Sequence, residues 1–455
     1  MKKNFYIVSC PKEEFNLLFH QPTSNIAKID KNIQEADLNV EALNLKVSNK
    51  SFVSPNKDLE YGKGKITLTF MSARTCNLGC TYCFADKGEY GDSSTKPKYI
   101  TYNLYMKALS KALLMYPEGI KRVGFFGGEP LLNFHEFKLF IPDCLEVFRK
   151  EGLDSPIFSL TTNLTLLTSE MIDFFKEYNI FINVSLDGEG EINDIARKYK
   201  KGNASVYNTV LKKCRMLEDK GVLYSIEATI NQNHIKEFES GDAIQWIQGI
   251  ERLNFNNIVI VPVETNISSL SIKTPKELDN LILFTKELVN YYINKVVSGN
   301  IYKLSPYMIL PVIQIIKKSY LRSCTSGQSF FCDTDGNLYP CHMFCNDSNY
   351  HLGNLDEGIN IPMSEEVANT NKEKCEDCNK CIARNICAIW CKGLQYLYNN
   401  DMLRVSETRC IFQRAIFEEC LITLADKEKR EKFLCNYKSY RNPMDAHENI
   451  GEKIG

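Results

Sequence analysis

Strand-like and helix-like patterns alternate along the middle of this chain. Short apolar, β-branched runs predict strands near 66–70, 122–126, 157–162, 181–186, 223–230 and 257–262. Amphipathic segments between them predict helices near 101–116, 133–150, 168–178, 205–220, 235–250 and 274–297. The last of these begins at Thr274-Pro275-Lys276-Glu277, a capping box with proline at the first helical position. Six β/α repeats predict an α/β fold in which a parallel sheet forms an open, partial barrel of the TIM type, because eight repeats would be needed to close it.

The regions on either side of these repeats differ in character. Residues 1–62 are predicted to form a small N-terminal α+β module, with a strand at 5–8, a hairpin from the runs 17–19 and 26–29, and a helix over 32–45. Residues 63–300 hold the barrel, and 301–455 form a cysteine-rich region. Within that region, residues 411–424 are apolar at helical spacing, and the charged chain after 427 is expected to be a frayed tail.

Composition excludes some classes of function. The 455 residues include 55 Lys and Arg and 56 Asp and Glu, and the net charge of −1 gives no electrostatic case for nucleic acid as a partner. No run of eighteen apolar residues occurs and the first residues are polar, so we expect a cytoplasmic protein that does not contact a membrane. In that compartment, eighteen cysteines indicate metal binding rather than disulfides.

Three cysteines follow the first predicted strand of the barrel. Cys76, Cys80 and Cys83 have the spacing CxxxCxxC, with Tyr82 before the last. Three thiolates on one short loop can hold a [4Fe–4S] cluster and leave one iron free for a substrate or cofactor. A zinc knuckle is the alternative, although zinc-binding loops usually use CxxC pairs.

This cysteine loop resembles that of the radical S-adenosylmethionine (SAM) enzymes. The resemblance implies that Cys76, Cys80 and Cys83 are catalytic, because they would hold the cluster that reductively cleaves SAM to methionine and a 5′-deoxyadenosyl radical. It also implies an external electron donor of the flavodoxin or ferredoxin type. The radical would then abstract a hydrogen atom from the substrate.

Polar motifs end several predicted strands, where parallel sheets bind their ligands. Gly127-Gly128-Glu129-Pro130 resembles the family's GGEP segment, which implies contact with the SAM amino group. Hydroxyl, amide and carboxylate groups at the next strand ends would suit a ribose and a carboxylate, and the resemblance implies that Arg197 pairs with the SAM carboxylate. Helix capping is the alternative role for Thr162 and Ser185, and Arg197 could be a surface charge. The expected SAM contacts are Tyr82, Gly127, Gly128, Glu129, Pro130, Thr162, Asn163, Ser185, Asp187 and Arg197.

The cysteines between 324 and 410 extend the resemblance. Cys324, a Gly336-x4-Cys341 unit, a C-x2-C-x5-C-x3-C run from Cys378 and a final Cys410 are similar to the seven-cysteine SPASM extension of radical SAM enzymes that modify peptides and proteins. This implies two auxiliary [4Fe–4S] clusters and three clusters in total. The expected ligand sets are Cys378, Cys381, Cys387 and Cys410 for one cluster, and Cys324, Cys341 and Cys391 for the other.

The fourth ligand of the second set stays open. Cys332 and Cys345 are candidates, and an iron left free for a substrate thiolate is the third option. From the residues alone, a double zinc ribbon is also compatible with these spacings.

The run 378–387 further resembles the maturases that form thioethers in Cys-rich peptides, the SCIFF, ranthipeptide and sactipeptide types. That implies a radical SAM peptide maturase whose substrate is a Cys-containing ribosomal precursor peptide. Residues 1–62 are similar in place and strand content to leader-recognition domains, which bind a peptide by strand addition; equally, they could only cap the barrel. Alternative functions are an anaerobic formylglycine-generating sulfatase maturase, a carbon–carbon crosslinking maturase and a zinc-binding scaffold protein.

Overall fold

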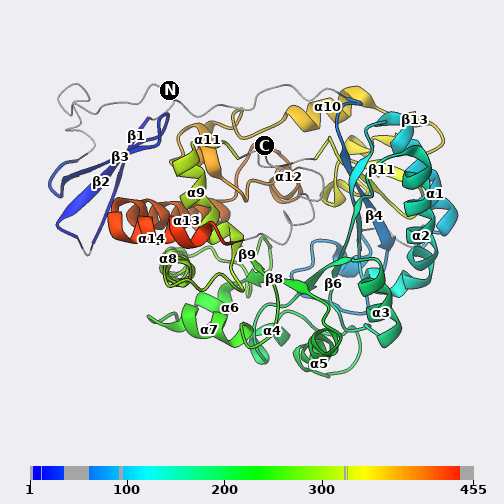
Figure 1. The fold of residues 1–455 in the computed structure, drawn as a ribbon, viewed down its shortest axis with the longest axis horizontal. Coiled ribbons are helices and arrows are strands. Elements are labelled where there is room, and N and C mark those ends of the chain that lie inside the picture. The colour runs from blue at the N-terminus through cyan, green and yellow to red at the C-terminus, as the bar shows by residue number, and fades with distance from the viewer. Residues whose placement is uncertain are drawn as a thin grey trace.

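A curved sheet forms the centre of the protein (Figure 1). The computed structural model describes residues 4–11, 13–34, 61–91, 96–321, 324 and 326–440. Six parallel strands lie side by side in chain order: β4 (Ile66–Ala73), β5 (Ile120–Gly127), β6 (Ile157–Thr162), β7 (Phe181–Ser185), β8 (Tyr224–Ile230) and β9 (Ile258–Pro262). All six were predicted to within three residues at either end, and the α/β partial barrel is confirmed.

Helices cover the outer face of these strands. The principal ones are α1 (Tyr102–Met115), α2 (Phe134–Glu151), α3 (Ser169–Glu177), α5 (Val206–Asp219), α7 (Asp242–Ile250) and α8 (Pro275–Val297). Two short helices, α4 (Glu191–Asp194) and α6 (Gln232–Ile235), lie between them. The helix predicted over 235–250 was wrong at its start, because Gly241 takes a left-handed φ of 104° and α7 begins only after it. The predicted capping box of Thr274 and Glu277 is confirmed.

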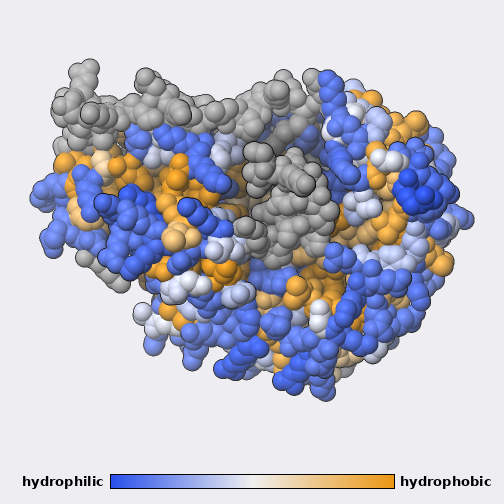
Figure 2. All heavy atoms as spheres, viewed as in Figure 1, coloured by the Kyte–Doolittle hydropathy of each residue, from blue (hydrophilic) through white to orange (hydrophobic). Residues whose placement is uncertain are grey.

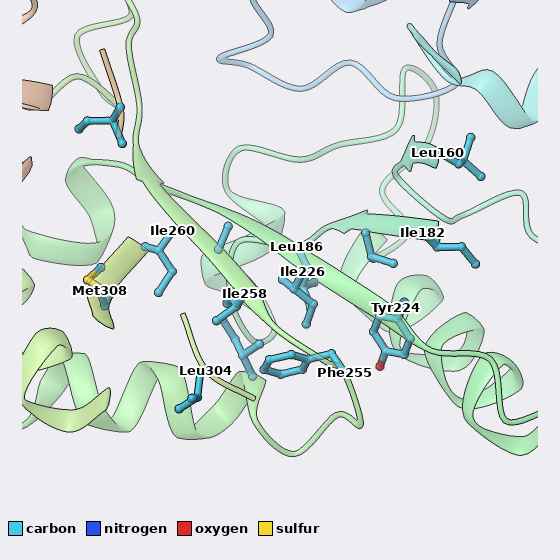
Figure 3. Packing of buried hydrophobic residues seen from close by; sticks show 14 of the residues in the cluster. Leu160, Ile182, Leu186, Tyr224, Ile226, Phe255, Ile258, Ile260, Leu304 and Met308 are labelled. Atoms are coloured by element: carbon cyan, nitrogen blue, oxygen red, sulfur yellow. The ribbon is translucent and has the colours of Figure 1, made fainter. Parts of the chain in front are cut away.

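Side chains alternate between two environments along the barrel strands. Isoleucines such as Ile226, Ile258 and Ile260 point outward and pack with Leu304 and Met308 beneath the covering helices (Figure 3). Residues that alternate with them point inward and line a cavity; they are Glu227 and Thr229 on β8 and Val259 and Val261 on β9. The inner face of the strands therefore borders a cavity, and their outer face packs against the covering helices.

The sheet continues beyond β4 into the cysteine-rich region. Strand β10 (Phe330–Cys332) pairs in parallel with β4, and β11 (Asn337–Tyr339), β12 (Gly353–Asn354) and β13 (Gly358–Ile359) follow antiparallel, which gives ten strands in one sheet. These four strands have three residues or fewer, too short for a periodic pattern to reveal. The cysteine-rich region thus shares the barrel's own sheet.

Helices also complete the C-terminal part: α9 (Pro306–Lys317), α10 (Ile361–Asn369), α11 (Glu376–Asn379), α12 (Lys392–Asn399), α13 (Glu407–Ala425) and α14 (Lys427–Tyr437). Helix α13 contains the helix predicted over 411–424. The frayed tail predicted after 427 was wrong as far as 437, because the Asp426 side chain caps α14 and Phe433 is buried. No helix in the described ranges is long and apolar enough to cross a membrane.

The N-terminal segment forms a separate three-stranded antiparallel sheet of β1 (Phe5–Val8), β2 (Phe15–His20) and β3 (Asn25–Asp30), as predicted. The helix predicted over 32–45 lies almost wholly outside the described residues. The sheet packs on α13, where the rings of Phe19 and Phe417 meet edge to face at 5.2 Å. Hydrophobic side chains gather in this part of the surface, whereas the face around α5 and α7 is mainly hydrophilic (Figure 2).

Candidate functional site

A cavity of about 670 Å³ opens at the carboxyl ends of the barrel strands. This volume lies in the range of small-molecule sites. Many of the residues singled out in the sequence line it, although they come from separate segments: Cys76, Cys80, Cys83, Tyr82, Gly127, Gly128, Thr162, Asn163, Ser185, Arg197, Cys324 and Cys391. Glu129, Pro130 and Asp187 are not on its surface and stand behind the wall.

The cysteine loop after β4 is fixed by a second segment. The amide of Gly79 donates to the carbonyl of Lys198 at 2.7 Å, and the amide of Thr81 donates to that of Ala196 at 2.8 Å. Leu78 also forms a bridge with Tyr199. The segment that carries Arg197 is therefore held against the loop that carries the three thiols.

The thiols of this loop are neighbours within electrostatic reach of one another. Burial, with smaller contributions from the nearby Glu129, Cys80 and Cys83, raises the pKa of Cys76 to about 12. Burial likewise raises the pKa of Cys80 to about 11, against the opposing effect of Arg197. Thiols in such a group become thiolates when a cationic centre binds them.

Polar hydrogens already point at the sulfur of Cys76. The backbone amide of Leu78 lies 3.4 Å from Sγ, and the side-chain amide of Asn163 lies 3.6 Å from it. Hydrogen bonds to sulfur are among the features that tune an iron–sulfur cluster. The donor set and its surroundings therefore fit a cluster held by Cys76, Cys80 and Cys83.

The positions of Gly127 and Gly128 leave no room for a side chain. A Cβ at Gly127 would lie 2.4 Å from the carbonyl oxygen of Ala73, and one at Gly128 would lie 2.2 Å from that of Thr75. The end of β5 thus passes directly against the start of the cysteine loop. Close approach to the neighbouring backbone already requires these glycines, whatever contact they make with a ligand.

Glu129 has a different environment from the one expected for a ligand of an amino group. It is fully buried, and its carboxylate accepts hydrogen bonds from the hydroxyl of Thr162 (2.7 Å) and the amides of Asn163 (2.8 Å) and Leu131 (3.0 Å). Burial raises its pKa to about 7 in spite of these donors. In this structure Glu129 ties the end of β5 to the end of β6, and Pro130 begins the short helix that follows.

Asp187 plays a similar part after β7. Its carboxylate lies 3.0 and 3.1 Å from the guanidinium of Arg197 and accepts hydrogen bonds from the Tyr82 hydroxyl at 2.5 Å and the Thr229 amide at 3.0 Å. Arg197 also lies over the ring of Tyr82, with 5.5 Å to its centroid. Asp187 therefore orients both cavity-lining side chains.

The sequence interpretation missed several charged lining residues. Glu227 lies on β8 and faces the cavity, where burial raises its pKa while Arg197 and Arg409 oppose the shift. The signal was present in the strand, because Ile226 and Ala228 are buried while Glu227 and Thr229 alternate with them toward the interior. Arg122 lines the same cavity from β5.

A second group of thiols lies at the same cavity, which Cys324 and Cys391 line. Burial raises the pKa of Cys341 to about 12, with further increases from Cys391 and Cys324, and Cys324 acts in the same direction on Cys391. Cys391 caps the N-terminus of α12, where the Leu394 amide lies 3.5 Å from its sulfur. A helix N-terminus favours thiolate, so this donor set also fits a bound cationic centre.

The two candidates for a fourth ligand in this group point elsewhere. The thiol of Cys332 is fully buried and lies 3.6 Å from the carbonyl of Asp333. Cys345 lies beside Arg74, Asp333 and Lys96, and burial raises its pKa to about 12. The hydroxyl of Ser326, in contrast, lies 3.2 Å from the sulfur of Cys324. The structure therefore groups Cys324, Cys341 and Cys391 without bringing Cys332 or Cys345 to them.

A third group of thiols lines a neighbouring cavity of about 550 Å³, and it comprises Cys378, Cys381, Cys387 and Cys410. Burial raises the pKa of Cys410 to about 12, and Cys387 and Cys381 contribute to the increase. Cys375 adjoins the group as well, because a hydrogen bond from the Cys378 thiol lowers the pKa of Cys375. Among the described residues, no three His, Cys, Asp or Glu side chains converge closely enough to hold a single metal ion.

Comparison with known proteins gives a family match over the barrel and similarity over most of the chain. Residues 71–231 match the family described as the radical SAM superfamily. The chain is 25% identical to a cysteine-type anaerobic sulfatase-maturating enzyme of Clostridium novyi over 68% of this chain and 83% of the relative. It is 26% identical to the enzyme of the same name from Clostridium perfringens, over 70% of this chain and 86% of the relative. The radical SAM cyclopropyl synthase TigE of Paramaledivibacter caminithermalis is 21% identical over 76% of this chain and 71% of the relative.

Solved structures show the same fold. The structure titled "Native anSMEcpe with bound AdoMet" superposes with a TM-score of 0.63 at 21% identity and covers 79% of this chain and 98% of that one. Streptococcus suis SuiB bound to S-adenosylmethionine superposes with a TM-score of 0.52 at 13% identity, over 90% of this chain and 100% of that one.

Proposed function

We propose that this chain, a radical SAM superfamily protein similar to anaerobic sulfatase-maturating enzymes, is a peptide maturase that joins a Cys sulfur to a carbon atom of the same peptide. One observation carries the proposal. Cys76, Cys80 and Cys83 line the same cavity as Cys324 and Cys391. A substrate in this cavity could reach both groups, so that hydrogen abstraction and thiolate binding can take place in one site.

Cys76, Cys80 and Cys83 are the residues that would hold the first [4Fe–4S] cluster, and SAM would lie beside them. Together these groups supply the radical that removes a hydrogen atom from carbon, chemistry that belongs to the cofactors. The chain's own residues bind and orient. Arg197 presents a guanidinium to the cavity, and Asp187 fixes its direction.

Cys324, Cys341 and Cys391 would hold an auxiliary cluster with one iron free for the substrate thiolate. The geometry favours this reading over a fourth cysteine ligand, because Cys332 and Cys345 lie against Asp333 and Arg74 instead. Cys378, Cys381, Cys387 and Cys410 would close the second auxiliary cluster, which gives three clusters in all. The additional clusters would accept the electron that is left when sulfur and carbon combine.

The substrate in this proposal is a ribosomal precursor peptide that contains cysteine, and the electron donor is a flavodoxin or ferredoxin. The three-stranded N-terminal sheet supports the peptide assignment, because β1 and β3 are its edges and an edge strand can pair with an extended leader.

A formylglycine-forming sulfatase maturase is the second candidate. The similarity to cysteine-type sulfatase-maturating enzymes over about 70% of the chain favours it. The two candidates differ in their product, because a thioether bridge keeps the sulfur while formylglycine formation loses it.

Co-expression with a Cys-rich precursor peptide, followed by mass spectrometry, distinguishes them. A loss of two hydrogens per bridge, with fragments that stay linked, supports the thioether; an aldehyde in place of a Cys supports the sulfatase type. Anaerobic purification with metal analysis tests the cofactors. About twelve irons per chain fit three [4Fe–4S] clusters, whereas a colourless protein with stoichiometric zinc supports the scaffold alternative. Cys76→Ala should abolish SAM cleavage.

A further inference from the structure

Four carboxylates lie in or directly behind the wall of the main cavity. Glu129 is occupied by three hydrogen-bond donors. Asp187 is occupied by Arg197, Tyr82 and Thr229. Glu227 faces two arginines. Glu264 differs from all three, because its Oε2 is buried and has no hydrogen-bond partner within the described part of the chain.

Glu264 stands two residues after the carboxyl end of β9, at the rim where the barrel meets the cysteine-rich region. It lines the main cavity and also the neighbouring cavity of about 550 Å³. The residues that line both cavities are Glu264, Ile389, Trp390, Cys391, Leu394 and Arg409. The carboxylate therefore belongs to the same partition as Cys391, one of the thiols expected to hold the open auxiliary cluster.

Two further observations concern this partition. The indole Nε1 of Trp390 is buried and has no hydrogen-bond partner among the residues that the structure describes. Tyr398 lines the main cavity, and its pKa is raised by burial and by the nearby charges of Glu264 and Cys83, so all three residues belong to one part of that cavity. Buried polar atoms without partners are rare in folded proteins and point to a group that completes them.

We propose that Glu264 is the proton acceptor for the substrate thiol. This inference rests on the proposed function and assigns a catalytic residue to it. A thiol that binds iron must lose its proton, and Glu264 is the carboxylate at this site with an unoccupied oxygen. A carboxylate in that position also suits a peptide whose reacting group is a neutral thiol rather than an anion.

In the proposed reaction the S–H bond of the substrate breaks, its proton goes to Oε2 of Glu264, and the sulfur keeps the electron pair. A hydrogen atom leaves the acceptor carbon for the radical derived from SAM. The sulfur supplies two electrons and the carbon radical supplies one. Two of these three electrons form the C–S bond, and the third reduces an oxidised iron–sulfur cluster. Glu264 later returns the proton to solvent.

Calorimetry tests the proton transfer without turnover. We would titrate 2-mercaptoethanol into the iron–sulfur protein, without SAM, in two buffers of different ionisation enthalpy. The wild type should release about no proton to the buffer, and Glu264→Gln about one, since the thiol proton then has no acceptor in the protein. Glu264→Asp keeps the carboxylate and should behave as the wild type does. Equal proton release by the wild type and Glu264→Gln would overturn the assignment, as would a failure of the thiol to bind.

Product analysis separates this inference from the proposed function. With the precursor peptide, Glu264→Gln should lower bridge formation about 100-fold, a usual effect of removing a general base, while 5′-deoxyadenosine formation stays within about twofold. Iron content identical to the wild type shows that the variant is folded and loaded. If Glu264→Gln forms bridges at the wild-type ratio to 5′-deoxyadenosine, the role of Glu264 is refuted while the proposed function stands. A wild type that cleaves SAM and forms no bridge refutes the proposed function and this role with it.

Discussion

The guanidinium of Arg74 and the carboxylate of Asp333 form an ion pair at 2.9 Å with both side chains completely buried. Arg74 is two residues before Cys76, and Asp333 begins the turn between β10 and β11. Arg74 also donates to Thr334 and Asn346, at 3.2 Å each. This pair connects the start of the cysteine loop to the cysteine-rich region, although the two residues are more than 250 positions apart in the sequence.

Removing one member of the pair should destabilise the protein strongly. Arg74→Met leaves the charge of Asp333 buried without its main partner, which costs about 3–5 kcal/mol of unfolding free energy. Lys96→Met is the matched control, because Lys96 is partly exposed and 3.9 Å from Asp333, and should cost about 1 kcal/mol or less. Denaturant unfolding under anaerobic conditions measures both, and similar values for the two variants would contradict the prediction.

Glu129 should make stability depend on pH. Its pKa is about 7 in the folded protein against an ordinary value of 4.5, so the folded state holds more protons between these values. Stability is therefore greatest below pH 4.5 as far as this group is concerned, and falls as the pH rises to about 7, by about 3 kcal/mol in total. Unfolding free energies measured from pH 5 to 8 for the wild type and Glu129→Gln test this. Between pH 5 and 8 the fall should be smaller by about 2.5 kcal/mol in the variant, and parallel curves would refute the prediction.

Arg197 should matter for SAM binding through its geometry as well as its charge. Arg197→Lys keeps the charge but cannot reach Asp187 with two nitrogens, and we expect SAM affinity to fall about tenfold. Arg197→Met should reduce it about 100-fold. Calorimetric titration of SAM into the iron–sulfur protein gives both values. Tyr82→Phe is the comparison, because it removes only the 2.5 Å hydrogen bond to Asp187; an unchanged affinity in Arg197→Met would exclude contact with SAM.

Gln21, from the N-terminal sheet, should affect the iron content of the site formed by Cys378, Cys381, Cys387 and Cys410. It is buried at the turn after β2, where its side chain accepts from Arg384 and donates to the carbonyl of Cys381 at 3.4 Å. Gln21→Ala should loosen the segment that carries Cys381 and Cys387, and iron should fall from about twelve toward about eight per chain. Thr23→Ala, in the same turn, is the control. Full iron in Gln21→Ala would show that the sheet does not support this site.

Periodicity and spacing predicted the barrel because its strands are buried and its helices amphipathic over long stretches. The same reasoning, together with the family resemblance, indicated many of the cysteine and polar residues that line the cavity, since strand ends of a parallel sheet must meet at one edge. It did not predict that Glu129 and Asp187 face the protein rather than the cavity, because a motif does not reveal which donors surround a carboxylate. Glu264 was missed for a related reason. It occupies a loop without pattern, and its distinction is an absent partner, which only the assembled structure discloses.

The contacts of Gln21 and Phe19 have a practical consequence for anyone who wishes to trim this protein. A shortened version that starts at the barrel would strip the apolar cover from α13, the helix that bears Cys410, and release the neighbouring loop at the same time. Such a version should be less stable and more prone to aggregate even with every cysteine intact. The first thirty residues therefore belong in any preparation intended for cluster assembly.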